Sequence, residues 1–154
     1  MIIYIDADAI PTIAKELIIK TANRTAVQAI FVANTYIKLP PSPYLKSVVV
    51  AQGFDVADTY IVDNVSKGDL VITGDIPLAN DVLEKGTKVL TSRGEEFTLN
   101  NIKSKLNARD FMESLRGTGV LDPKEMGGQK PYGDKEKMAF ANGLNRLVKP
   151  TQIS

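Results

Sequence analysis

Short apolar runs alternate with amphipathic stretches along most of this chain. Runs rich in β-branched and aromatic residues predict buried strands at residues 1–5, 27–33, 47–51, 69–73 and 87–91. Between them, apolar residues recur at helical spacing and predict helices over residues 11–21, 55–65 and 77–85. This alternation predicts a three-layer α/β fold with a central, mostly parallel sheet of about five strands.

The last third of the chain follows a different pattern. After Thr98 the spacing predicts a helix to Arg116, with an interruption near Asn107. Residues 117–133 contain five glycines and two prolines, which predicts a loop. Asp134 can cap a final helix over 134–148, with Met138 among its apolar positions. A length of 154 residues is typical of one domain, so we expect a single domain over 1–154.

The amino-acid composition excludes several kinds of catalytic site. The chain has no histidine and no cysteine, which excludes Ser-His-Asp and Cys-His nucleophile systems and zinc sites built from imidazole or thiolate. No apolar stretch approaches a membrane span, and the apolar start lacks a basic lead, so we expect a cytoplasmic protein without membrane partners. Hydrolytic chemistry would therefore depend on carboxylates that hold a hard cation, Mg²⁺ or Mn²⁺.

Acidic residues stand where predicted strands end. Asp6 and Asp8 close the first strand, and Asp75 follows the fourth. Because strand ends of a parallel sheet meet at one edge, we expect these carboxylates to converge there. Asp55 and Asp58, three residues apart at a helix start, lie on one face and can look toward the same edge. A role as the N-cap of the following helix explains the position of Asp8, and that of Asp75, as well as a role in a site does.

Other polar residues have competing interpretations. Asp81 precedes Lys85 by four residues, which favours a surface ion pair over a site role. Asn34 ends the second strand and Arg93 the fifth, so each is a candidate substrate contact, although turns also favour both positions. The charge is uneven: residues 1–102 carry 9 Lys or Arg and 12 Asp or Glu, whereas residues 103–154 carry 10 and 6. An acidic site beside a basic segment suits a polyanionic substrate, although on charge alone a solvated basic surface is the better explanation.

Several of these motifs, in order and over nearly the whole chain, resemble the signature blocks of the bacterial YaiI/YqxD family. The matching blocks are Ile5-Asp6-Ala7-Asp8-Ala9, Val32-Ala33-Asn34, Leu39-Pro40-Pro41-Ser42-Pro43, Gly53 to Asp58, Gly68 to Ala79, Asn107 to Met112 and Phe140 to Leu144. That family is similar in fold to PIN-like nuclease domains. The resemblance implies a Mg²⁺ or Mn²⁺ site with Asp6 and Asp8 from the first strand, Asp75 from the fourth, and Asp58 or Asp55 from the helix between them.

Three functions follow as expectations. The first is a metal-dependent nuclease or phosphodiesterase on RNA or DNA, with RNA slightly favoured. Asp6, Asp8, Asp58 and Asp75 would be catalytic, and Asn34, Lys38, Arg93 and Arg109 would contact substrate. The second is a haloacid-dehalogenase-type phosphatase, whose opening strand also ends Asp-x-Asp, with Asp6 as nucleophile and Asp8 as acid and base. The third is a non-enzymatic module that binds nucleic acid or a protein partner. The pattern leaves the oligomeric state open.

Overall fold

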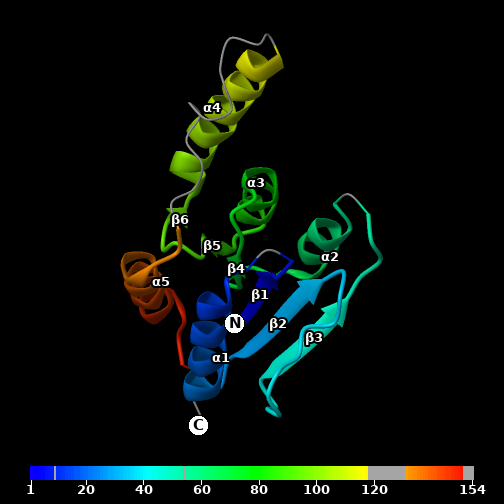
Figure 1. Ribbon diagram of the computed structural model, residues 1–154, viewed down its shortest axis with the longest axis vertical. Coiled ribbons are helices and arrows are strands. Elements are labelled where there is room, and N and C mark those ends of the chain that lie inside the picture. Colours follow the sequence, from blue (N-terminus) through cyan, green and yellow to red (C-terminus); the bar gives the residue numbers. More distant parts are fainter. Residues whose placement is uncertain (9, 54, 118–130, 151–154) are drawn as a thin grey trace.

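The protein is built around a six-stranded sheet with strand order β3-β2-β1-β4-β5-β6 (Figure 1). The computed structural model describes residues 1–8, 10–53, 55–117 and 131–150, and only the backbone of residues 109–117. The strands are β1 (Ile2–Asp6), β2 (Gln28–Ala33), β3 (Leu45–Val49), β4 (Leu70–Ile72), β5 (Lys88–Leu90) and β6 (Glu96–Phe97). All neighbouring pairs are parallel except β5 and β6, so the sheet is mostly parallel, as predicted.

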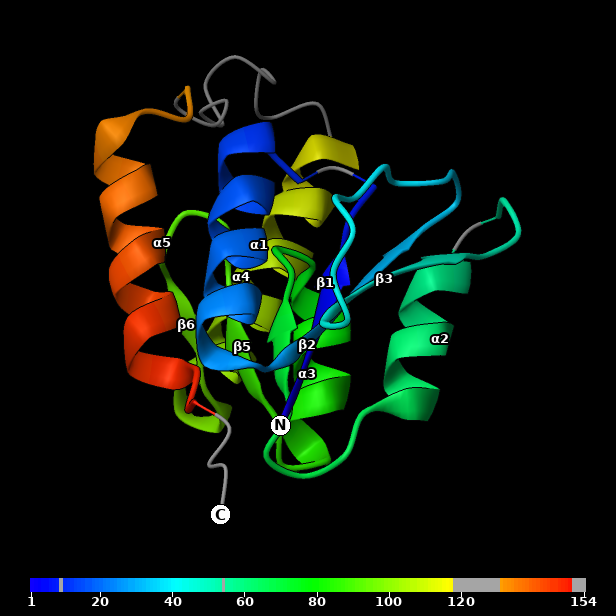
Figure 2. The same cartoon turned by 90° about the horizontal axis from the view of Figure 1, so that it is seen from below.

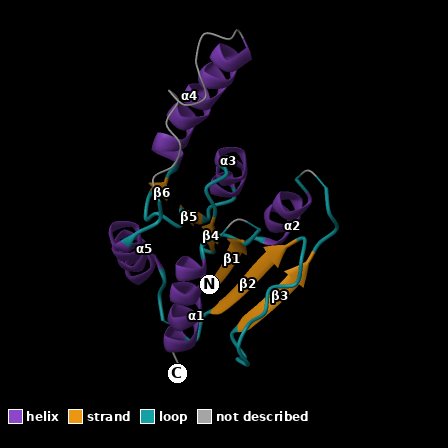
Figure 3. Ribbon diagram, in the orientation of Figure 1, coloured by secondary structure: helices purple, strands orange, loops and turns teal. Residues whose placement is uncertain are grey.

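Helices cover both faces of this sheet and make the three predicted layers (Figure 3). They are α1 (Thr12–Thr25), α2 (Val56–Asn64), α3 (Ile76–Glu84), α4 (Leu99–Gly117) and α5 (Asp134–Leu147). Helices α1 and α5 pack on one face, and α2, α3 and the start of α4 pack on the other. No helix within the described residues is long and apolar enough to span a bilayer.

The strand residues explain this layering, because successive side chains of a strand point to opposite faces. In β1, Ile3 and Ile5 join the core beneath α1 and α5, whereas Tyr4 joins the core beneath α2 and α3. Phe140 and Leu144 of α5 are fully or almost fully buried in the first of these cores. A strand that is apolar on both faces forms a continuous apolar run in the sequence. For this reason the central strands could be predicted from the sequence.

The register of the sheet brings three strand ends to the same level. Ile5 of β1 lies opposite Phe31 of β2 and Ile72 of β4. The chain builds outward from β1 to β2 and β3, then returns to β4 on the other side of β1. The order therefore reverses between β1 and β4, and open α/β sheets bind ligands at the carboxyl end of such a reversal.

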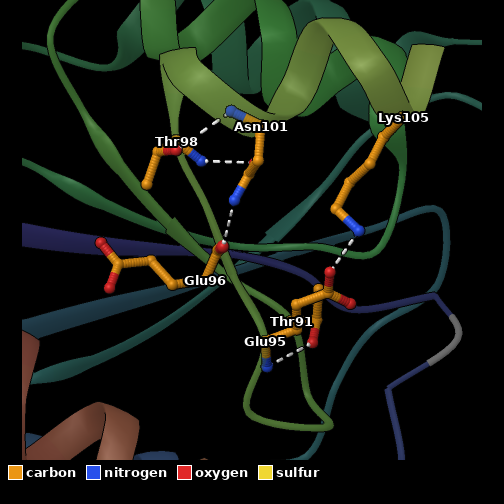
Figure 4. A network of polar contacts seen from close by, with 6 residues as sticks. All are labelled: Thr91, Glu95, Glu96, Thr98, Asn101 and Lys105. Atoms are coloured by element: carbon orange, nitrogen blue, oxygen red, sulfur yellow. Dashed lines mark hydrogen bonds and ion pairs between the residues drawn. The ribbon is translucent and has the colours of Figure 1, made fainter. Parts of the chain in front are cut away.

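The sixth strand was not predicted, whereas the helix after it was. β6 has two residues and pairs antiparallel with β5, too short for a periodic signal. A polar network fixes the start of α4 (Figure 4). Thr98 and Asn101 exchange backbone-to-side-chain hydrogen bonds of 2.9 and 3.2 Å, and the Asn101 amide donates to the Glu96 carbonyl at 3.1 Å. Lys105 pairs with Glu95.

Several boundaries differ from the sequence predictions. α4 is continuous through Asn107, so the predicted interruption there is wrong. Asp134 is the first residue of α5 and does not cap it; Glu136 instead accepts the Gly133 N–H at 3.0 Å. Met138 is 66% exposed and does not join the core. Most of the predicted loop over 117–133 lies outside the described residues.

Candidate functional site

A hollow of about 200 Å³ opens at the carboxyl edge of the sheet, beside the reversal between β1 and β4. We call it the acidic pocket. Its polar lining consists of Asn34 and five carboxylates, which are Asp6, Asp8, Asp55, Asp58 and Asp75. The structure thus brings together all five predicted acids and one of the four predicted substrate contacts. In Figure 2 this edge is the upper end of the strands.

Asp6 is partly buried at the end of β1. It is the last residue of β1, and its Oδ2 accepts a 3.0 Å hydrogen bond from the Thr73 hydroxyl at the end of β4. Burial raises the pKa of Asp6, and the carboxylates of Asp75 and Asp8 raise it further, while the Thr73 hydrogen bond opposes them. The bond across the two strands fixes the orientation of the Asp6 carboxylate at the reversal point.

Asp75 has the capping role that the sequence left open, and it also lines the acidic pocket. Its Oδ1 accepts the Leu78 N–H at 3.0 Å as the N-cap of α3, and its own N–H donates to the Thr73 hydroxyl at 3.0 Å. One carboxylate oxygen of Asp75 thus caps α3, and its backbone N–H is bound to Thr73 at the end of β4. These two hydrogen bonds fix the position of Asp75 between β4 and α3. Capping and lining the pocket are compatible functions of this side chain.

Asp8 does not cap the helix that follows it. The N-cap of α1 is Pro11, and no side chain caps that end. The Oδ1 atom of Asp8 accepts the Asn34 backbone N–H at 2.9 Å instead. This bond ties the segment after β1 to the segment after β2, and it places the exposed Asp8 and Asn34 at one wall of the acidic pocket.

Asp55 and Asp58 face the pocket from the start of α2. Asp55 is the N-cap residue and has φ +63°, a conformation that side chains other than Asn and Asp rarely adopt. Burial raises the pKa of Asp58 to about 7, and the negative charges of Asp75, Asp6 and Asp55 contribute in that order. A hydrogen bond between Asp58 and Asp55 adds to this. The crowded, partly buried position thus favours the protonated form of Asp58.

Two further hollows adjoin the acidic pocket. One, of about 320 Å³, shares Asp6 and Asp75 with it and is completed by residues such as Ile10, Thr73 and Ser92. The other, of about 240 Å³, shares Asp55 and Asp58 and extends between α2 and α3 to Asp63 and Asp81. The acidic pocket thus lies between a hollow at the sheet reversal and a hollow between α2 and α3.

The remaining predicted contacts lie elsewhere. Arg93 lies 3.7 Å from the Glu136 carboxylate and packs over the ring of Tyr132, so it contributes to holding α5. Lys38 lines a separate groove against α1. The side chain of Arg109 lies outside the described residues. The ion pair predicted between Asp81 and Lys85 is wrong: the Lys85 ammonium donates to the Val62 carbonyl, and Asp81 lines the α2–α3 hollow.

The comparisons with known proteins agree on one family. The family model described as "Uncharacterized BCR, YaiI/YqxD family" matches residues 4–150. The chain belongs to the YaiI/YqxD family. A "UPF0178 protein" of Psychrobacter cryohalolentis is 63% identical over 149 residues, covering 97% of this chain and 100% of the relative. A "UPF0178 protein" of Halorhodospira halophila is 49% identical and covers 99% of each chain. No solved structure matches significantly.

This YaiI/YqxD protein offers donors of the chemistry that hard cations prefer. Carboxylates and an amide oxygen suit Mg²⁺ or Mn²⁺ better than softer metals. Among the described residues, no group of three or more acidic side chains is arranged to hold one ion directly. Mg²⁺ commonly retains several waters and binds through one or two carboxylates plus substrate phosphates. The donor set therefore fits a partly hydrated ion.

Sequence reasoning missed one polar residue at this YaiI/YqxD site. Thr73 bridges Asp6 and the Asp75 backbone through a single hydroxyl. The signal was present, because Thr73 follows the buried run of β4 directly and precedes Asp75 by two residues. Thr is common in strands, so it is not conspicuous there without knowledge that β1 and β4 are neighbours.

Proposed function

We propose that this protein is a metal-dependent phosphodiester hydrolase that acts on nucleic acid, with Mg²⁺ or Mn²⁺ as its cofactor. The observation that supports this most strongly is the convergence of five carboxylates on one small pocket at the sheet reversal, without a basic side chain in the pocket's described lining. Like charges in such proximity are unfavourable unless protons or cations neutralise them. Burial raises the pKa values of Asp6 and Asp58, and the neighbouring carboxylates raise them further.

The proposal assigns different tasks to the carboxylates. Asp6 and Asp75 come from the two strands that flank the reversal, so they are the best candidates to hold the ion, with Asp8 and Asn34 on the neighbouring wall. A bound Mg²⁺ or Mn²⁺ would stabilise the charge that develops on a phosphoryl group and lower the pKa of a bound water. Thr73 keeps the Asp6 carboxylate oriented.

Asp58 is the best candidate to accept the proton of the attacking water. An effective general base has a pKa near the working pH, and burial together with neighbouring carboxylates raises the pKa of Asp58 to about 7. Asp58 also has a side-chain hydrogen bond with Asp55. Water is then the nucleophile, and no covalent intermediate forms on the protein.

A cleavage assay tests this proposal. Mixed single-stranded RNA and DNA would be incubated with protein and Mn²⁺, then with EDTA. We expect metal-dependent cleavage that Asp6→Asn and Asp75→Asn each reduce by at least about 100-fold, the usual scale for losing one electrostatic or acid–base contributor. Glu84→Gln, an exposed acid at the end of α3, is the matched control and should retain activity.

The other two functions give different outcomes. A phosphatase of the haloacid-dehalogenase type would form a phosphorylated Asp6, which can be trapped and located by mass spectrometry. A binding module would retain nucleic-acid affinity in EDTA and show no cleavage with any divalent metal. Either result contradicts the proposed hydrolase.

A further inference from the structure

The segment that joins β2 to β3 has a regular alternation that the acidic pocket does not explain. Ile37 and Leu39 are half-buried and pack on the core beneath α1, whereas Tyr36, Lys38 and Pro40 are exposed. The three exposed residues alternate with the two half-buried ones, so they lie on the part of this segment that faces away from the core. We call Tyr36, Lys38 and Pro40 the outer stripe. Figure 2 shows this segment running beside α1.

The outer stripe is held in place at several points. The Ile37 N–H donates to the Ser47 hydroxyl of β3 at 3.2 Å. Farther along, the Ser42 hydroxyl donates to Asn23 of α1 at 2.5 Å. Despite this support, the Tyr36 ring is 72% exposed and contributes little to the core. A fixed segment that presents an aromatic ring to solvent is a preformed platform for a flat ligand.

Beside the stripe lies a groove of about 340 Å³ with a basic and apolar lining. Lys15 and Lys20 of α1 and Lys38 line it, with Glu16 as its one described acid, and Ile19 and Pro40 contribute apolar surface. Three lysines beside apolar side chains suit a ligand that carries repeated negative charge on a partly apolar body. The groove thus has a charge opposite to that of the acidic pocket.

In the sequence, the stripe also follows closely after a residue of that pocket. Asn34 lines the acidic pocket, and Tyr36 follows two residues later. We propose that the outer stripe and the α1 groove bind a single nucleic-acid strand, with a base stacked on Tyr36 and phosphates on Lys15, Lys20 and Lys38, and that they lead this strand to the acidic pocket. Sequence-tolerant single-strand sites combine a basic groove with exposed aromatic rings in this way. The proposal rests on the proposed function, because it supplies the path of that reaction's substrate.

Binding is tested separately from cleavage, in EDTA, with a fluorescent single-stranded oligonucleotide of about ten nucleotides, which is within the usual site size. Tyr36→Ala should weaken binding roughly five- to tenfold, at the low end for loss of one stacked base, while Tyr36→Phe should bind like wild type. Lys38→Ala should reduce the slope of log affinity against log salt by about 0.7, the contribution of one phosphate contact to a single strand. Lys88→Ala, an exposed strand lysine outside the groove, should change neither.

Equal affinity of wild type and Tyr36→Ala for the oligonucleotide would overturn the proposal. So would displacement of the strand by polyglutamate with no effect of Tyr36→Ala, because that result identifies a groove for acidic peptides. The two proposals fail differently. Tight binding without cleavage contradicts only the hydrolase, and cleavage that is unchanged by Tyr36→Ala and Lys38→Ala contradicts only the strand path.

Discussion

The crowding of carboxylates predicts that removing one charge should stabilise the metal-free protein, and Asp58 is the best place to measure this. Its pKa is about 7 in the folded state and 3.8 in the reference state. Below pH 3.8 the carboxyl is neutral in both states and has no effect. As the pH rises, the unfolded chain ionises first, so the folded state loses stability until the pH exceeds about 7.

A pKa displacement of this size corresponds to at most about 4 kcal/mol of lost stability above pH 7. Asp58 is partly exposed, so solvent screening reduces the expected loss to about 1–2 kcal/mol. Asp58→Asn replaces the acid by a neutral isostere that can still hydrogen-bond to Asp55. The substitution should therefore stabilise the metal-free protein by about 1–2 kcal/mol at pH 8, and by less at pH 5.

Urea unfolding in EDTA at pH 5 and pH 8 measures this difference directly. Glu84→Gln changes the net charge equally at an exposed position outside the pocket, and it accounts for general charge effects. An Asp58→Asn protein no more stable than wild type at pH 8, after that correction, would refute the reasoning. So would an equal gain at both pH values, because the gain must develop as Asp58 ionises in the folded protein.

Two other predictions address the supports of the site. Asp75→Asn should leave the stability of the metal-free protein unchanged or raise it, because Asn also caps helices. Asp75→Ala should lose the hydrogen bond from the Leu78 N–H and destabilise the protein by about 1 kcal/mol. Equal melting temperatures of the two variants in EDTA would contradict the capping role of Asp75. Gly94→Ala should destabilise the protein by at least about 2 kcal/mol, measured by urea unfolding. The reason is that Gly94 has φ +89° and that an added Cβ would lie 2.5 Å from Ala139 of α5. Unchanged stability would show that α5 moves aside freely.

The strands and helices that could be predicted from the sequence are those whose burial produces a recognisable pattern of apolar residues. β1, β2 and β4 are apolar on both faces, so their residues formed continuous runs. Pro11, at the N-cap of α1, and Pro77, in the first turn of α3, marked the starts of those helices. The edge strand β3 is half-buried, and its predicted range of 47–51 begins two residues after the observed start at Leu45. β6 depends on pairing with β5 and on the network around Asn101, which are contacts between distant residues.

The residues of the candidate site were also predictable only where a local pattern placed them. Asp6, Asp8 and Asp75 could be placed together because strand ends share one edge, and the α2 acids because of their helical spacing. Arg93 could not be placed, since its pairing with Glu136 depends on how α5 returns to the sheet. Lys38 was predicted as a substrate contact, but the groove it shares with Lys15 and Lys20 could not be foreseen, because it exists only when the β2–β3 connection lies beside α1.

The most direct test of the proposed metal site is a calorimetric titration of the protein with Mn²⁺ at neutral pH. We expect saturable binding by wild type and by Glu84→Gln, and its loss in Asp6→Asn. The same ion should stabilise wild type against unfolding by about 2.7 kcal/mol at a hundredfold excess over Kd. Heats that are flat for wild type, or identical for wild type and Asp6→Asn, would contradict a metal site at the acidic pocket and, with it, the proposed hydrolase.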